Sequence, residues 1–326
     1  MVGLRLLLLG AALLIGEMPA AIAQTSSDAT ARANGGTVAV ISGGIDGTYV
    51  RIVSDLSAVL DDGERLRVLN VLGKGSLQNM ADILFLKGID VGIVQSDVLA
   101  YAKSQHVFPG VEHTVQYIAK LYDEEVHVLA APSIGSLDDL AGKTVNVDGR
   151  GSGTAMTSAV LFGALGIKVQ YANDDQAVAL EKLKRGEIAA LVFVAGKPAR
   201  LFSDVGAGSG LHFLPVPLND ALLQTYLPAR FTAADYPGLV ADGAEVDTIA
   251  VGSVMAVFAW QPGSERYNKV ARFVDAFFDH FAALQKKPRH PKWHDVNLAA
   301  QAPGWTRFPE AQALLQRPGL HLANAP

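Results

Sequence analysis

Three glycine-rich turns are the parts of this sequence that could do chemistry. They read SGGIDGTY (residues 42–49), GKGSLQN (residues 73–79) and GRGSGT (residues 149–154), and each follows an expected strand and opens an expected helix. The first turn of a helix has N–H groups without partners in the helix, and the helix dipole adds partial positive charge there. Glycine lets the backbone come close to a bound group. Such turns can therefore bind a carboxylate or a phosphate without lysine or arginine.

Each of these turns also carries hydroxyl or amide side chains that can hydrogen-bond a ligand. A single turn of this kind is equally well explained as an efficient connection between a strand and a helix. Three turns together favour binding over that structural explanation. The polar side chains are Ser42, Thr48, Tyr49, Ser76, Gln78, Asn79, Ser152 and Thr154.

Alternating strands and helices are expected to position the turns. The expected strands cover residues 37–42, 66–72, 90–95, 144–148 and 189–194, the expected helices cover residues 48–60, 76–87, 97–103, 153–165, 172–185, 198–202 and 265–285, and further apolar runs lie at residues 115–121 and 126–131. This order predicts an α/β protein with a mostly parallel sheet, helices on both faces and two lobes. Ligands bind such sheets in the crevice at the carboxyl ends of the strands, where the glycine turns lie.

Composition excludes several classes of function. The chain has 326 residues, 50% of them hydrophobic, and a net charge of −5 without a cluster of Lys or Arg, which argues against a nucleic-acid partner. The length suits two domains. The absence of cysteine rules out disulfides, thiolate metal sites, a cysteine nucleophile and a lipid anchor on an N-terminal cysteine.

The N-terminus has the pattern of a secretory signal. Arg5 precedes an apolar run over residues 6–15, and Ala21-Ile22-Ala23 gives an A-x-A cleavage site. The alternative is a retained membrane anchor, but the apolar run is too short, because a transmembrane helix needs about 20 residues. We therefore expect a signal peptide over residues 1–23, a flexible leader over residues 24–36, and a mature protein in the periplasm.

Motifs for nucleotides, metals and catalysis do not fit. Ser42 and Thr154 occupy positions where a dinucleotide fingerprint requires glycine, and Leu137 does so for a P-loop ending at AGKT. Ser152 is not in a G-x-S-x-G elbow, because Arg150 stands where its first glycine would be. Without an assembled acid–base pair, the sequence favours a binding protein over an enzyme, and we expect no cofactor.

Metal binding is also not expected. His290 and His294 have the i, i+4 spacing of a helical zinc pair, but Pro291 lies between them. His127 lies in an apolar run, where a histidine with satisfied hydrogen bonds in the core is the more common explanation.

Several ordered motifs resemble the TAXI-type solute receptors of TRAP transporters. The motifs are SGGIDGTYV, GKGSLQNM, VGIVQSDVLAYA, LYDEEVHVLAAPSIGSLDDLAGKTVNVDGRGSGT and AALVFVAGKPA, from about residue 37 to residue 216, with weaker similarity to about residue 285. The resemblance implies a two-lobe periplasmic-binding-protein fold of type II with two crossing strands, near residues 126–132 and 247–257, as a hinge. It places residues 37–130 and 255–326 in the first lobe and residues 131–254 in the second.

The resemblance also implies a ligand, a partner and a set of contacts. The ligand would be a small carboxylate of the glutamate, 2-oxoglutarate or dicarboxylate class, delivered by a monomeric receptor to the TRAP-type membrane permease. The implied ligand-binding residues are Gly44, Tyr49, Ser76, Asn79, Gln95, Ser96, Arg150, Ser152, Gly153 and Thr154. Two departures from the usual motif affect the ligand: Ile45, Asp46 and Val50 alter the first turn, and Arg150 adds a cation that could contact a second carboxylate.

Two alternatives remain at this point. An exported hydrolase would use Ser152 as nucleophile with His127 or His212 as base. A periplasmic ligand sensor would have the same fold as the receptor without a permease partner. Ligand-dependent stabilisation by small anions favours a receptor over a hydrolase, and a neighbouring permease gene favours a transport receptor over a sensor.

Overall fold

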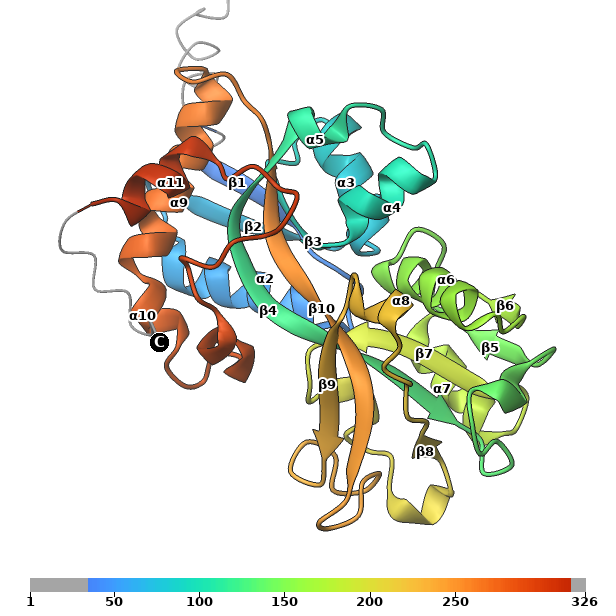
Figure 1. Ribbon diagram of the computed structural model, residues 1–326. Coiled ribbons are helices and arrows are strands. Elements are labelled where there is room, and N and C mark those ends of the chain that lie inside the picture. Colours follow the sequence, from blue (N-terminus) through green and yellow to red (C-terminus); the bar gives the residue numbers. More distant parts are fainter. Residues whose placement is uncertain (1–34, 318–326) are drawn as a thin grey trace, which may run out of the picture.

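Two long strands run through both halves of the molecule and connect them (Figure 1). In the computed structural model, which describes residues 35–317, these strands are β4 (Val115–Ala130) and β10 (Glu245–Phe258). They lie side by side and antiparallel at the centre of a single sheet with the order β2-β1-β3-β10-β4-β7-β5-β6. Two shorter strands lie off this path, where β8 pairs with β4 and β9 pairs with β10.

The remaining strands divide into two groups around this pair. The first lobe contains β1 (Thr37–Ile41), β2 (Arg67–Val71) and β3 (Val91–Gln95), and the second contains β5 (Thr144–Asn146), β6 (Gln170–Ala172), β7 (Ala190–Ala195), β8 (His212–Phe213) and β9 (Leu227–Thr232). Each long strand changes partner along its length. In β10, residues 253–257 pair with β3, whereas residues 245–250 pair with β9. In β4, residues 125–130 pair with β7. The lobes therefore meet near Glu125 and Gly252.

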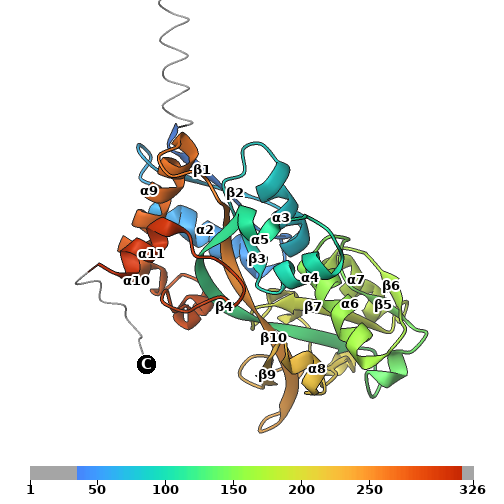
Figure 2. The same cartoon turned by 45° about the horizontal axis from the view of Figure 1, so that its top comes forward.

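Helices cover both faces of each lobe. In the first lobe, α2 (Thr48–Leu60), α9 (Glu265–Asp279), α10 (Phe281–Leu284) and α11 (Pro309–Leu315) lie on one face, and α3 (Ser76–Phe85), α4 (Val98–Ser104) and α5 (Val111–Thr114) lie on the other. In the second lobe, α6 (Gly153–Leu165) and α8 (Asp220–Leu223) cover one face and α7 (Gln176–Lys184) covers the other. Figure 2 shows α6 and α7 at the end of the molecule far from α9 and α11. Four buried apolar clusters result, one for each face of each lobe.

The expected two-lobe α/β fold with two crossing strands is confirmed. The helices at Thr48–Leu60 and Gly153–Leu165 have the predicted bounds. The prediction of a mostly parallel sheet is wrong, because the sheet is mixed. Pairing is parallel between β1, β2 and β3 and between β5, β6 and β7, but the strands that pass between the lobes pair antiparallel with their neighbours.

Three other elements differ in extent from the prediction. The apolar runs at residues 115–121 and 126–131 form one strand of 16 residues rather than two elements. The helix expected over residues 265–285 ends at Asp279 and is followed by α10, with His280 between them. The helix expected over residues 198–202 is a single 3-10 turn, Arg200–Phe202. The predicted signal peptide and most of the leader lie outside the described residues.

The C-terminal segment packs on the first lobe. Trp293, Phe308 and Leu314 are fully buried in the cluster that contains α2 and α9. Trp305 Nε1 donates to the carbonyl of Ser96 at 2.9 Å, beside the junction of the lobes. Within residues 35–317, no helix combines the length and apolar character that a membrane span requires. The division of the chain at residues 130 and 254 stays a prediction.

Candidate functional site

Three helices begin at one cavity between the lobes. The helices are α2, α3 and α6, and their first residues Thr48, Ser76 and Gly153 all line it. Each helix follows a parallel strand, so the glycine turns place all three helix starts at the carboxyl ends of strands. The main-chain N–H groups of these three residues have no acceptor among the described residues. Three positive helix ends therefore face the same space.

Two of the glycines are required, one by its backbone conformation and the other by close contact between the lobes. Gly75 precedes α3 with φ of 102°, a conformation that side chains rarely adopt. Gly153 lies against the other lobe, and a Cβ there would come within 2.7 Å of Ser76 Oγ and still closer to Gln95 Oε1. The two lobes therefore meet through bare backbone at the start of α6.

Hydrogen bonds between the lobes surround the cavity. Gly196 N donates to Thr48 Oγ1 at 3.2 Å, and Gln95 Nε2 donates to Thr157 Oγ1 at 3.2 Å. Tyr226 Oη donates to Asp97 Oδ2 at 3.1 Å. The inner cavity has a volume of about 50 Å³, enough for a few water molecules. The contacts between the lobes thus leave only a small space, which adjoins a wider hollow of about 320 Å³.

Most of the predicted site residues meet at this cavity. Those that line it are Gly44, Tyr49, Ser76, Gln95, Ser152, Gly153 and Thr154. Several of their side chains already have protein partners. Ser76 Oγ donates to Gln95 Oε1 at 3.0 Å, and Thr154 Oγ1 accepts from Val194 N at 3.1 Å. The main chain of the helix starts is therefore more available to a ligand than these hydroxyls.

The other predicted residues lie outside the cavity lining. The Asn79 amide is buried and donates to the carbonyl of Ile93 at 2.7 Å, so it fixes the second turn. Ser96 lies beside β10, where its N–H donates to the carbonyl of Gly252 at 2.7 Å. Arg150 is exposed at the mouth, in a hollow that Lys74 also lines.

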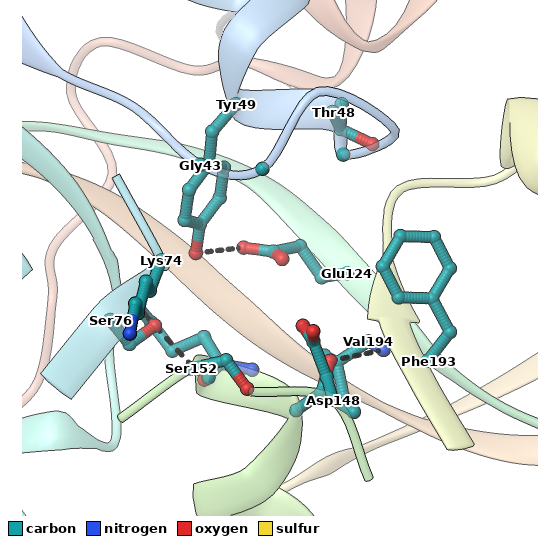
Figure 3. Close-up of a pocket in the computed structure, with 16 residues that line it drawn as sticks. Gly43, Thr48, Tyr49, Lys74, Ser76, Glu124, Asp148, Ser152, Phe193 and Val194 are labelled. Atoms are coloured by element: carbon teal, nitrogen blue, oxygen red, sulfur yellow. Dashed lines mark hydrogen bonds between the residues drawn. The ribbon is translucent and has the colours of Figure 1, made fainter. Parts of the chain in front are cut away.

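Two carboxyl groups in the cavity were missed by the sequence reasoning (Figure 3). Glu124, in β4, is 3% exposed and accepts a hydrogen bond from Tyr49 Oη at 2.7 Å. Burial raises the pKa of Glu124 well above its usual value, and the hydrogen bond from Tyr49 opposes that shift. Asp148 has φ of 68° and lies between β5 and the third turn. Burial raises the pKa of Asp148 to about 6. The position of Glu124 between the apolar runs at residues 115–121 and 126–131 was the available signal.

Ser152 has a structural role at this site. Its Oγ accepts a hydrogen bond from Ala155 N at 3.1 Å and caps α6. The ring nitrogens of His127 lie 3.0 Å from the carbonyl of Phe193 and 2.6 Å from Tyr236 Oη, deep in the second lobe. No histidine lines the cavity formed by the described residues. The hydrolase alternative therefore has a serine that caps a helix and has no histidine beside it.

Comparison with known proteins places the chain in a family. The model of the NMT1-like family matches residues 40–301. The chain belongs to the NMT1-like family. This NMT1-like protein is similar in structure to a protein described as a periplasmic transporter, with 12% sequence identity over 77% of this chain and 84% of the other and a TM-score of 0.50. It is also similar to a protein from Bordetella bronchiseptica RB50, with 14% identity over 80% and 76% of the chains and a TM-score of 0.52. At these identities the likeness shows the two-lobe fold.

No metal site accompanies the cavity. Within the part of the chain that the structure describes, no group of three or more His, Asp or Glu side chains is arranged to hold a metal ion. The polar groups available in the cavity are main-chain donors, hydroxyls, the Gln95 amide, two carboxyl groups and the side chain of Lys74.

Proposed function

We propose that this NMT1-like protein is an exported solute receptor of the TAXI type that binds a small organic acid or acidic amino acid between its lobes. It delivers this ligand to the permease of a TRAP transporter and acts as a monomer in the periplasm. The convergence of three helix starts on one small cavity between the lobes is the observation that carries the proposal. Helix starts that lack intrahelical acceptors are ready-made sites for a carboxylate.

The energetics of such a site are adequate for a transport receptor. Micromolar affinity corresponds to about 8 kcal/mol. Four to six hydrogen bonds to a charged carboxylate, each contributing about 1.5–3 kcal/mol, reach that value after the cost of association is subtracted. The contacts between the lobes would then form over the ligand by a hinge movement of β4 and β10.

The receptor is preferred to the hydrolase because Ser152 caps a helix and has neither His127 nor His212 beside it. The sensor alternative uses the same site and differs only in its partner. Finding a gene for a large polytopic permease beside the gene for this chain would favour the transport receptor over the sensor.

A thermal-shift and calorimetric panel tests the proposal. Mature protein is unfolded, stripped of ligand and refolded, and then mixed with dicarboxylates, monocarboxylates and amino acids. Binding to the folded state raises the melting temperature by mass action, so at least one small carboxylate should raise it by several degrees. Native mass spectrometry of protein that has never been unfolded identifies any ligand that co-purifies. A panel in which no small carboxylate shifts the melting temperature contradicts the proposal.

A further inference from the structure

The charges that line the cavity do not suit a ligand with negative charge alone. Glu124 and Asp148 supply two carboxyl groups, and the only cation lining the cavity is the exposed side chain of Lys74, as far as the described residues go. A purely anionic ligand would therefore place its charge near the helix starts but also near two acids. Burial already raises the pKa of each acid, and a ligand anion beside them would disfavour their ionised forms further.

We propose that the ligand carries an amino group in its cationic form, which Glu124 binds, together with a carboxylate bound by the helix starts. The inference rests on the proposed function and narrows its ligand class from organic acids in general to amino acids. Asp148 adds negative charge on the wall that belongs to the second lobe (Figure 3).

The surroundings of Glu124 support this role. One carboxyl oxygen accepts the hydrogen bond from Tyr49 Oη, and the other has no hydrogen-bond partner among the described residues. The nearby cation Lys292 is already engaged, with its Nζ 2.8 Å from Glu125 Oε1. A buried carboxyl group without a cation is unfavourable when ionised, because desolvation opposes its charge. A ligand ammonium group at the free oxygen would satisfy both the charge and the hydrogen bond.

The two parts of the ligand have separate places in the cavity. The carboxylate would face the first N–H groups of α2, α3 and α6, and the ammonium group would face β4. The inner cavity of about 50 Å³ suits the small head group of an amino acid. A second adjoining hollow, of about 380 Å³, is lined by Lys74 and Arg150 and leaves room for its side chain. Lys74 and Arg150 at the mouth could then pair with a side-chain carboxylate.

Matched ligand pairs that differ only by the amino group test the inference. Suitable pairs are L-glutamate and glutarate, L-aspartate and succinate, and L-alanine and propionate. Calorimetry with ligand-stripped wild-type protein should show, for at least one pair, that the amino acid binds at least tenfold more tightly than its partner acid. The amino group is the sole difference within a pair, so the ratio measures its recognition.

Substitutions test whether Glu124 is the residue that recognises the amino group of the ligand. Glu124→Gln keeps an oxygen for Tyr49 Oη but removes the negative charge, and it should reduce the preference for the amino acid at least tenfold while binding of the partner acid falls less. Glu181→Gln, an exposed residue of α7, is the matched control and should change neither affinity by more than twofold. Asp148→Asn provides a second variant, since asparagine tolerates positive φ, and should give a smaller loss in the same direction.

The outcomes separate the two proposals. If the plain acid binds as tightly as the amino acid in every pair that binds, the amino-group inference is overturned and the receptor for carboxylates stands. If the amino acid is preferred but Glu124→Gln melts cooperatively and leaves the ratio unchanged, the assignment to Glu124 is overturned. If no member of any pair binds, the amino-group inference is overturned, and the proposed function falls as well if no other carboxylate of the thermal-shift panel binds.

Discussion

Among single residues, Gly153 decides how closely the lobes approach. Any side chain at this position meets Gln95 and Ser76 of the other lobe. We expect Gly153→Ala to hold the lobes apart and to weaken ligand binding at least tenfold. Calorimetry with the panel member that gives the largest thermal shift measures the loss.

Gly163 provides the matched control on the same helix. A Cβ at Gly163 meets nothing within 4 Å, so Gly163→Ala adds a methyl group to α6 without a clash. It should leave affinity within twofold and stabilise the protein by up to about 1 kcal/mol, because alanine favours a helix interior. Equal affinities for the two variants would show that close contact at Gly153 does not contribute to binding.

Arg150 is a second residue with a specific expectation. Its exposed position at the mouth, near Lys74, suits a second ligand carboxylate rather than the first. Arg150→Ala should therefore weaken binding of L-glutamate about tenfold and binding of L-alanine less than twofold, if both bind the wild type. A charge-assisted hydrogen bond of about 1.5–3 kcal/mol accounts for such a difference. Equal losses for the two ligands would assign Arg150 a structural role.

Among the elements, the C-terminal segment and β4 are joined by a buried ion pair. Lys292 Nζ lies 2.8 Å from Glu125 Oε1, and the two side chains are only 7% and 5% exposed. Lys292→Met removes the cation and leaves a carboxylate buried at the junction of the lobes. We expect a loss of about 3 kcal/mol in the free energy of unfolding, because breaking a buried pair leaves an uncompensated charge.

The same substitution at an exposed pair is the control for this prediction. Lys184 Nζ lies 2.8 Å from Glu181 Oε1 on α7, but these side chains are 36% and 57% exposed. Lys184→Met should cost less than about 0.5 kcal/mol, as surface pairs do. Urea unfolding of both variants gives the comparison, and similar small losses would mean that the Lys292 contact adds little to stability.

The elements of this fold were largely predictable from sequence, and their long-range pairing was not. Hydrophobic periodicity and caps are local signals, so the helices after the first and third turns were placed correctly at both ends. The pairing of β10 between β3 and β4 joins residues more than 100 positions apart, and no local pattern encodes it. The mixed sheet was therefore missed.

The candidate site was predictable where glycine turns open helices. Seven predicted residues meet at the cavity, including Tyr49 and Gly153. Glu124 was missed because a glutamate in a strand is equally consistent with an exposed edge. Only the packing of α2 against β4 shows that it is buried and bonded to Tyr49. Asn79 was named for its type, but its amide is engaged by the main chain of its own lobe.

For the molecule as a whole, the burial of Asp97, which accepts a hydrogen bond from Tyr226 of the other lobe, makes the stability of the joined lobes sensitive to pH. Asp97 lies after β3, Tyr226 precedes β9, and burial raises the pKa of Asp97 from 3.8 to about 6. Between pH 3.8 and about pH 6, Asp97 therefore holds its proton more strongly in the folded protein than in the unfolded chain. This contribution to stability is therefore complete below about pH 4 and is lost as the pH rises through about 6.

Asp97→Asn isolates this contribution. Asparagine keeps an oxygen for Tyr226 and does not ionise, so the variant should gain stability relative to wild type by up to about 3 kcal/mol between pH 4 and pH 7. Urea unfolding at several pH values measures the difference, and subtraction cancels the opposite effect of His127, whose pKa burial lowers to about 3. Asp138→Asn, at an exposed position, should show no such trend. A constant difference across this range would contradict the prediction.

The position of β10 has a consequence for synthesis. This strand fills the space between β3 and β4, yet it follows them in the chain by more than 100 residues. A nascent chain that has left the ribosome only as far as residue 240 has no strand to close that gap, and the first lobe also lacks α9 and the buried Trp293. The first lobe can therefore be completed only when the last quarter of the polypeptide is available. For the export that we propose, such a delay would help to keep the growing chain in the unfolded form that a secretion channel accepts.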